Sequence, residues 1–313
     1  MKAASYLSLL LLLVIPTLRN ARPADGRTTQ RESVSLRYAG DHFDWQTLET
    51  DVLKVNWYQG DENFGQSALD AASAGLESIN RLVPVDQSQP VEIFIYANVE
   101  DLHSTLTPDS EPWIVGHADP VQGVVRVVIA PGPEQGITME QRLPHELMHI
   151  MLYRRVSAGY YNLPAWLREG TATLAEIYLN ADYDRVLADA AANNHLIPVK
   201  DLCDSFPTDT GQAFLAYAES RSFTNFLHET YGSTGLLHLA DSYADGADCE
   251  RGPELAFSVS LASLEMDWRS SMLGQNTFLS VLQNISPYLA LLCLVLVIPL
   301  MGILTTLQKR KLS

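Results

Sequence analysis

The sequence has few basic residues. Its 313 residues include 21 Lys and Arg against 37 Asp and Glu, which gives a formal net charge of −16. Proteins that bind nucleic acid neutralise phosphates with clusters of Lys and Arg, so this deficit argues against a nucleic-acid partner. Charged residues make up only 19% of the chain and apolar residues 47%. That balance excludes a wholly disordered or fibrous protein.

Cysteine is also scarce. The chain has three cysteines, and none has the spacing of a zinc knuckle. Cys293 falls in a long apolar run, which leaves Cys203 and Cys249 in the acidic part of the chain. These two either form one disulfide, which would suit an oxidising compartment, or remain two free buried thiols. The sequence leaves both alternatives open.

Basic residues are concentrated at the two ends. Positions 27–277 hold 15 basic and 36 acidic residues, and the other six basic residues lie near the termini. The start of the chain combines a lysine, an apolar run from Tyr6 to Pro16 and two arginines, which is the pattern of a secretory signal peptide. We therefore expect residues 1–24 to be a signal peptide, with an uncleaved signal anchor as the alternative.

Charge is absent from a long stretch near the other end. No charged residue occurs between Arg269 and Lys309, and residues 288–307 are mostly apolar. At ~1.5 Å per residue, such a helix crosses a hydrocarbon core of ~30 Å. The alternative, a buried C-terminal helix, is weaker because soluble helices rarely lack a polar face. The basic tail, 308–313, is expected in the cytoplasm by the positive-inside rule, with the body outside the cell membrane on one span.

The acidic body begins with strand signals and continues with helical ones. Alternating or continuous apolar patterns predict strands at 33–38, 52–58, 91–96 and 123–129. Residues 68–82 carry an apolar stripe at helical spacing, and the signals from Thr138 to Trp268 are nearly all helical. Strands followed by helices predict an α+β domain.

A metal-binding pattern occurs where the helices begin. Residues 145–149 read His-Glu-Leu-Met-His. Two histidines four residues apart lie on one helix face, ~6 Å apart along the axis, so both can bind one metal ion. The glutamate between them, Glu146, is placed to act as a base. Chance predicts about 0.01 such patterns in a chain of this composition, and the apolar flanks favour metal ligands over a polar surface helix or two core histidines.

A third ligand is expected from the next helix. No histidine stands six residues after the second one, which excludes the metzincin ligand set. We expect Asn162 to cap a helix that runs through Ala175, with Glu169 about one turn in. Glu169 is therefore the predicted third ligand, and an exposed helix carboxylate is the alternative. Glu176, two turns further on, is the second choice.

These motifs resemble a known family. The HELMH sequence, followed after 19 residues by the glutamate of P-x-W-L-x-E-G, is similar to the gluzincin metallopeptidases, and specifically to the peptidase MA-like domain proteins. Residues 216–223, A-Y-A-E-S-R-S-F, resemble that family's A-Y-A-Q-S-x-S-F helix. Residues 226–232 and 264–269 resemble its helix end and terminal helix. The likeness covers roughly residues 53–272.

The resemblance implies a fold, a cofactor and an activity. It implies a zincin-like domain with an N-terminal mixed sheet and a C-terminal helical subdomain, in which His145, His149 and Glu169 bind Zn²⁺. It also implies that Glu146 is the catalytic base and that Tyr217 stabilises the oxyanion. A tyrosine that only packs in the core is the alternative for Tyr217.

The expected protein is a membrane-anchored, extracytoplasmic zinc metallopeptidase that cleaves peptide or protein substrates. The G-x-M-E-N signature of gluzincin aminopeptidases is absent, which favours an endopeptidase. The alternative is a zinc-containing, non-catalytic binding ectodomain, and the retained Glu146 argues against it. The expected organisation is a signal peptide at 1–24, a β segment at 25–65, a peptidase MA-like domain at 66–272, a juxtamembrane linker at 273–287, a transmembrane helix at 288–307 and a cytoplasmic tail at 308–313.

Three expectations concern the surroundings of the site. Pro144 cannot donate a hydrogen bond, so it either starts the HExxH helix or kinks it. The strand at 124–129 is expected at the edge of the sheet, where an extended substrate could pair with it. His117 and Asp119, just before that strand, either line the site or are ordinary loop residues.

Overall fold

A computed structural model describes residues 43–85, 88–106 and 114–274, together with Ile285, Ser286, Tyr288 and Leu292. The chain divides into Met1–Asp41 and His42–Ser313, and every described residue belongs to the second unit.

Several predicted segments lie outside the described residues. These are the signal peptide at 1–24, the strand at 33–38, and nearly all of the span at 288–307 with its tail. Within the part of the chain that the structure describes, no helix combines the length and hydrophobicity needed to cross a membrane.

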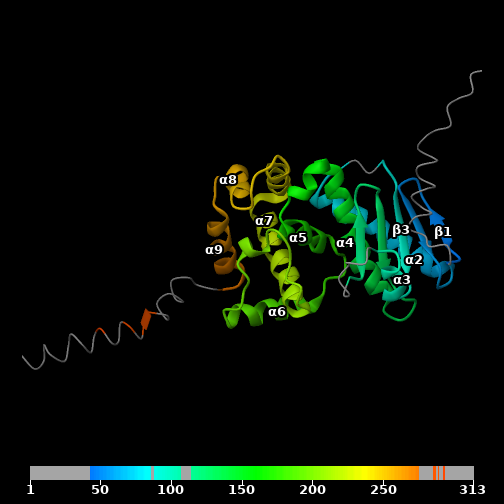
Figure 1. Cartoon of the computed structure of the whole chain (residues 1–313), viewed down its shortest axis with the longest axis horizontal. Coiled ribbons are helices and arrows are strands. Elements are labelled where there is room, and N and C mark those ends of the chain that lie inside the picture. The colour runs from blue at the N-terminus through cyan, green and yellow to red at the C-terminus, as the bar shows by residue number, and fades with distance from the viewer. Residues whose placement is uncertain are drawn as a thin grey trace, which may run out of the picture. The chain divides into compact units, whose positions relative to one another are not determined.

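A five-stranded mixed sheet forms the first half of the domain (Figure 1), in the order β1-β2-β3-β5-β4. Its strands are β1 (Gln46–Glu49), β2 (Leu53–Trp57), β3 (Val91–Tyr96), β4 (Gly116–Asp119) and β5 (Val124–Val128). The strands β2, β3 and β5 are parallel, and the two outer strands run antiparallel to their neighbours. With the helices that follow, this sheet confirms the α+β prediction.

The central strands were predictable and the outer ones were not. β2, β3 and β5 fall within the predicted strands at 52–58, 91–96 and 123–129. β1 and β4 have four residues each, Q-T-L-E and G-H-A-D, with too few apolar residues to show a pattern. The expectation that 124–129 lies at the edge is wrong, because β5 pairs with β3 on one side and β4 on the other. On that side of the sheet the edge strand is β4.

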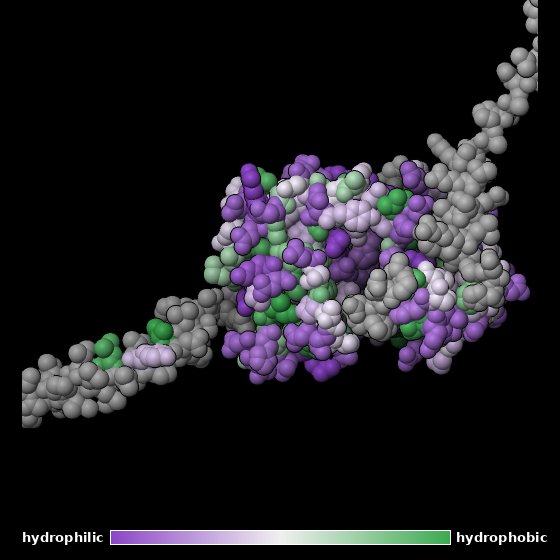
Figure 2. Space-filling model, viewed as in Figure 1, coloured by the Kyte–Doolittle hydropathy of each residue, from purple (hydrophilic) through white to green (hydrophobic). Residues whose placement is uncertain are grey.

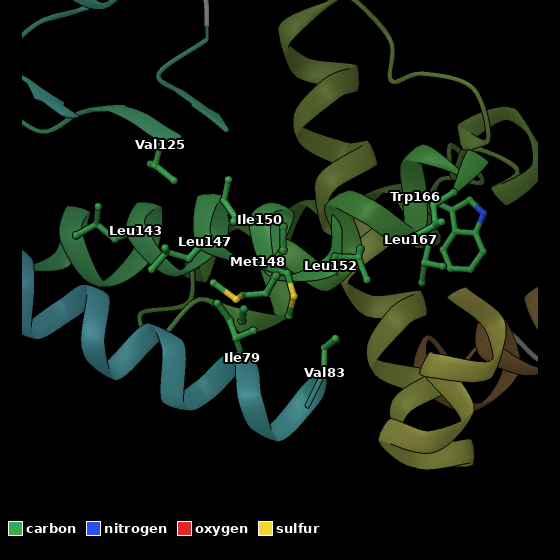
Figure 3. Close-up of a cluster of buried hydrophobic side chains, with 14 of the residues drawn as sticks. Ile79, Val83, Val125, Leu143, Leu147, Met148, Ile150, Leu152, Trp166 and Leu167 are labelled. Carbon is green, nitrogen blue, oxygen red and sulfur yellow. The ribbon is translucent and has the colours of Figure 1, made fainter. Parts of the chain in front are cut away.

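Two long helices, α2 (Glu62–Leu82) and α4 (Gln135–Val156), pack together against the sheet. Their contact is built from fully buried side chains such as Ile79 of α2 and Leu147 and Met148 of α4, and it meets Val125 of β5 (Figure 3). Burying apolar area at roughly 25 cal/mol per Å² makes this cluster a main source of stability. It also fixes the helix that carries the HExxH motif.

Pro144 lies inside α4, since the helix begins at Gln135. A proline nitrogen cannot donate to the carbonyl four residues earlier, which here belongs to Glu140. That carbonyl instead accepts from the backbone nitrogens of Ile177, at 3.0 Å, and Tyr178, at 3.4 Å. The proline therefore frees an acceptor that ties α4 to the segment following α5.

The second half of the domain is helical, as predicted for 138–268. Its helices are η1 (Ser157–Asn162), α5 (Ala165–Ala175), α6 (Ala181–Ala192), η2 (Val199–Leu202), α7 (Thr210–Ala244), α8 (Arg251–Phe257) and α9 (Leu261–Met272), and a short α3 (Val99–His103) lies in the first half. Gly232, the glycine of the predicted helix end, has φ +68° and breaks α7 into two segments.

The helix α5 is packed tightly onto α7 through a glycine. A Cβ on Gly170 would lie 2.2 Å from Thr224 Oγ1 and 2.5 Å from the Ser220 carbonyl oxygen, so no larger residue fits. The prediction that Asn162 caps α5 is wrong: the cap position is Pro164, and the Asn162 side chain donates to a carbonyl of α7. The predicted helix end at Ala175 is confirmed.

Of the two alternatives for Cys203 and Cys249, the structure has the disulfide. The bond joins residues 46 positions apart, for which loop-closure entropy predicts about 4 kcal/mol of stabilisation. The Cys203 carbonyl accepts from the backbone nitrogen of Ala165, at 2.7 Å. The cross-linked segment therefore contacts the first residue of α5.

Candidate metal centre

A cavity of about 540 Å³ lies between the sheet and the helical half. Figure 2 shows the surface hollowed between the two halves of the domain. The cavity is lined by β4, α4, η1, α5 and α7, among other segments. All five predicted site residues line it: His145, Glu146, His149, Glu169 and Tyr217.

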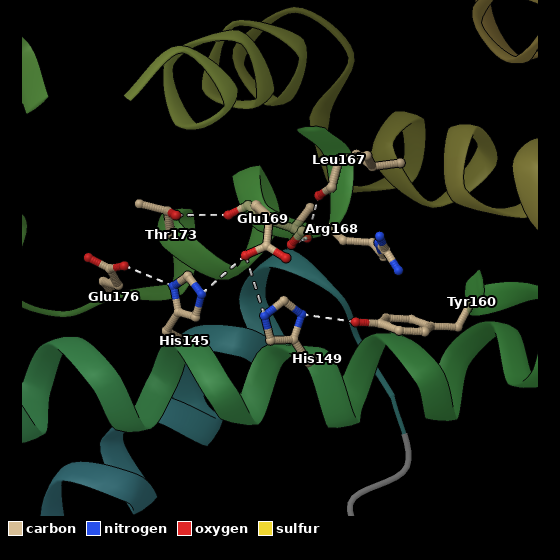
Figure 4. Close-up of polar contacts among 9 residues, drawn as sticks. His145, His149, Tyr160, Leu167, Arg168, Glu169, Thr173 and Glu176 are labelled. Atoms are coloured by element: carbon tan, nitrogen blue, oxygen red, sulfur yellow. Dashed lines mark hydrogen bonds and ion pairs between the residues drawn. The ribbon is translucent and has the colours of Figure 1, made fainter. Parts of the chain in front are cut away.

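Three potential metal ligands converge in this cavity. The Glu169 Oε2 atom lies 3.5 Å from His145 Nε2 and 3.7 Å from His149 Nε2. One donor atom from each residue lies within 4.8 Å of the others. In Figure 4 the two imidazoles rise from consecutive turns of α4 and Glu169 reaches toward both from α5. The spacing on α4 and the close approach of α5 at Gly170 together produce this convergence.

Each histidine has a second partner on its other nitrogen. His145 Nδ1 lies 3.0 Å from Glu176 Oε1, and His149 Nδ1 lies 3.0 Å from the Tyr160 hydroxyl (Figure 4). These contacts orient the rings so that both Nε2 atoms face Glu169, as is usual for histidines that bind metals. Glu176, the second choice as a ligand, therefore contacts a ligand from behind and does not belong to the donor cluster.

The charges of the cluster suit a cation. Burial alone would raise the pKa of Glu169, but His149 and His145 outweigh it and lower that pKa to about 2. Burial lowers the pKa of His149 to about 4, so this imidazole is neutral and keeps a lone pair. Burial also acts to lower the pKa of His145, but hydrogen bonds to Glu169 and Glu176 raise it well above its ordinary value. Metal binding must therefore displace a proton from His145.

Glu146 lies beside the cluster without joining it. Burial is the main cause that raises its pKa, to about 7, although the charge of His145 opposes the shift. Its carboxylate lies against the backbone of β4, where a Cβ on Gly116 would come within 2.2 Å of Oε1. A glycine at this place in the edge strand therefore leaves room for the carboxylate.

Tyr217 approaches the cluster from α7. Its ring centroid lies 6.1 Å from that of His145, and burial, followed by the charge of Glu169, raises the pKa of its hydroxyl. The hydroxyl therefore keeps its proton at neutral pH and can act as a hydrogen-bond donor.

Other residues of the cleft divide into predicted and unpredicted ones. His117 lines the cavity, whereas Asp119 is not among its lining residues and accepts a hydrogen bond from the Gln122 backbone. Tyr160 and Gly116 were missed. No motif marks Tyr160, and Gly116 belongs to a strand without an apolar pattern.

The donor set fits zinc. Two imidazole nitrogens and one carboxylate are the ligands of many catalytic zinc sites, which keep a further position for water or substrate. Among the residues that the structure describes, the buried Glu176 Oε2 atom has no hydrogen-bond partner, which leaves a second acceptor beside His145. Another cavity, of about 650 Å³, lies between α6, α7 and the end of α9. None of the five predicted site residues lines this second cavity.

An HExxH helix, a carboxylate from the following helix and a mixed sheet whose edge strand borders the cleft define a metallopeptidase. Comparison with protein families agrees: the Peptidase MA superfamily matches residues 71–274, and the chain belongs to that superfamily. The protein is thus a metallopeptidase, with a potential metal site at His145, His149 and Glu169. A comparison with curated proteins finds no match for the chain.

Proposed function

We propose that this protein is a zinc endopeptidase that cleaves peptide bonds in extended polypeptides. The observation that carries the proposal is the convergence of His145, His149 and Glu169 in one cavity, with Glu146 beside them but outside the donor cluster. When bound, zinc would supply Lewis-acid chemistry, polarising the substrate carbonyl and lowering the pKa of water.

The side chains around the donors would supply the remaining chemistry. Glu146 would accept the proton of the attacking water and later pass it to the leaving amine, because a carboxylate with a pKa near 7 can do both at neutral pH. Tyr217 would donate a hydrogen bond to the substrate oxygen as negative charge develops on it. Glu176 and Tyr160 would hold the two imidazoles in place.

The edge strand supports an extended substrate. β4 pairs with β5 along one side and borders the cavity through Gly116 and His117. An extended peptide could pair with its other side, which would bring a backbone carbonyl close to Glu146. Binding by backbone pairing does not require a free terminus, which favours an endopeptidase over an exopeptidase.

We further propose that the catalytic domain lies outside the cytoplasm on one C-terminal span. The apolar, uncharged run at 288–307 and the basic tail after it support this topology, as does the Cys203–Cys249 disulfide, which is typical of an oxidising compartment. A reporter fused after Ser313 tests it. A reporter found outside the cell would rule out this orientation.

The test of the proposed activity uses the full chain, purified in mild detergent. We expect about one zinc ion per chain by elemental analysis, and cleavage of an unfolded protein at internal bonds by mass spectrometry. A chelator should abolish cleavage, and added zinc should restore it. Stoichiometric zinc without cleavage of any unfolded substrate would instead favour a non-catalytic binding domain.

A further inference from the structure

Three consecutive apolar side chains are exposed after α5. Ile177, Tyr178 and Leu179 are 40%, 43% and 45% exposed. Single exposed apolar residues are common, but three in a row usually mark a surface that contacts a partner. We call these three residues the apolar segment.

The apolar segment has a defined backbone. At its start, the backbone nitrogens of Ile177 and Tyr178 both donate to the Glu140 carbonyl that Pro144 leaves free. At its end, the Asn180 side chain accepts from the Asp182 nitrogen, at 3.0 Å, and caps α6. Hydrogen bonds at both ends thus hold the backbone of the segment in place before any partner binds, which reduces the backbone entropy that binding would cost.

The apolar segment is continuous with the catalytic cavity. The residues on either side of it, Glu176 and Asn180, both line that cavity. Glu176 also contacts His145, so the apolar segment begins one residue after a side chain that contacts a potential metal ligand. Ile137, another exposed apolar residue, lies one turn before Glu140 on α4.

We propose that the apolar segment binds apolar side chains of the polypeptide substrate, a few residues from the bond that is cleaved. The inference rests on the proposed endopeptidase function and adds a substrate preference to it. Three residues span at most ~10 Å, so the segment matches about three residues of an extended substrate. The acidic Asp182 and Asp184 follow closely, which disfavours docking on an anionic membrane surface.

The test compares a double variant, Tyr178→Ser with Leu179→Ser, with the wild type as full-length, zinc-loaded protein. The substrates are fluorogenic peptides of about ten residues that share one scissile core, taken from a bond the wild type cuts. They carry Leu or Ser three positions from that bond, on one side or the other. Met266→Ser is the matched control, because Met266 is also exposed, at 51%, but lies on α9.

We expect the wild type to prefer Leu over Ser by roughly five- to tenfold in kcat/KM on one side of the bond. The double variant should lose most of that preference and still cleave the Ser peptides at the wild-type rate, with unchanged zinc content. The control should keep the preference. This combination separates a substrate contact from a general defect in folding or metal binding.

One result would overturn the inference: a double variant that keeps the full preference for Leu. If that variant also binds phosphatidylcholine vesicles more weakly than the wild type, the segment would be assigned to lipid. If the zinc-loaded wild type cleaves none of the peptides, the proposed function itself fails and this inference falls with it.

Discussion

Glu146→Gln is expected to lower kcat by 10²- to 10⁴-fold while the protein keeps its zinc. Glutamine has nearly the same shape as glutamate but cannot accept the proton of the attacking water. Glu146 lies outside the three-residue donor cluster, so the substitution leaves the ligands unchanged. Steady-state cleavage of a fluorogenic peptide and elemental analysis of the same sample measure the two quantities together.

A second variant, with a larger residue on the adjacent strand β4, perturbs the same carboxylate without changing Glu146 itself. A Cβ at position 116 would collide with Glu146 Oε1, so Gly116→Ala should displace the carboxylate and lower kcat by about 10²-fold, again with zinc retained. Leu147→Ala, which removes a fully buried side chain of the same helix, is the packing control. It should lower the melting temperature without this selective loss of catalysis. Equal cleavage by Glu146→Gln and the wild type would assign the activity to another site or a contaminant.

His145→Ala and His149→Ala should each remove both the bound zinc and the activity. Either change takes one of three donors away and leaves Glu169 without one of the two histidines that hold it ionised. Elemental analysis should fall from about one zinc per chain toward zero, with cleavage falling in parallel. Circular dichroism of the variants shows whether the fold is kept.

Substitutions of the residues that contact the histidine ligands should weaken zinc binding less than loss of a ligand does. Glu176→Gln replaces the carboxylate beside His145 with a neutral amide, and Tyr160→Phe removes the hydroxyl beside His149. Both leave all three donors, so zinc affinity should fall by about 10- to 100-fold. Added zinc should then restore cleavage by these variants, but not by a variant in which both His145 and His149 are changed to Ala. Stoichiometric zinc in a folded protein that lacks both histidines would disprove the site.

The residues that form the centre were predictable because their signals are local. The HExxH spacing places two histidines on one helix face, and the W-L-x-E-G pattern identifies Glu169. Tyr217 could be proposed only through resemblance, since one tyrosine on a long helix carries no periodic signal, and its role stays a prediction. The structure brings all of them to one cavity.

The parts that escaped prediction depend on contacts between distant segments. β4 is a strand because β5 holds it at the sheet edge, and its G-H-A-D sequence shows no pattern of its own. Tyr160 contacts His149 only because η1 folds back along α4. Pro144 could be recognised as a departure from regular helix, but the backbone nitrogens that donate to the carbonyl it frees, those of Ile177 and Tyr178, lie more than thirty residues later in the chain.

The Cys203–Cys249 disulfide closes a loop that contains all of α7. A peptide bond cut within that loop would leave both fragments attached, so a nicked chain would still be one molecule under non-reducing conditions. α7 carries Tyr217, which lines the cavity, and packs against Gly170, the neighbour of Glu169, so the fragment that stays attached includes part of the cavity wall. In a protein that cleaves peptide bonds, the cross-link would keep a chain that is cut within this loop, close to the cavity, in one covalent piece.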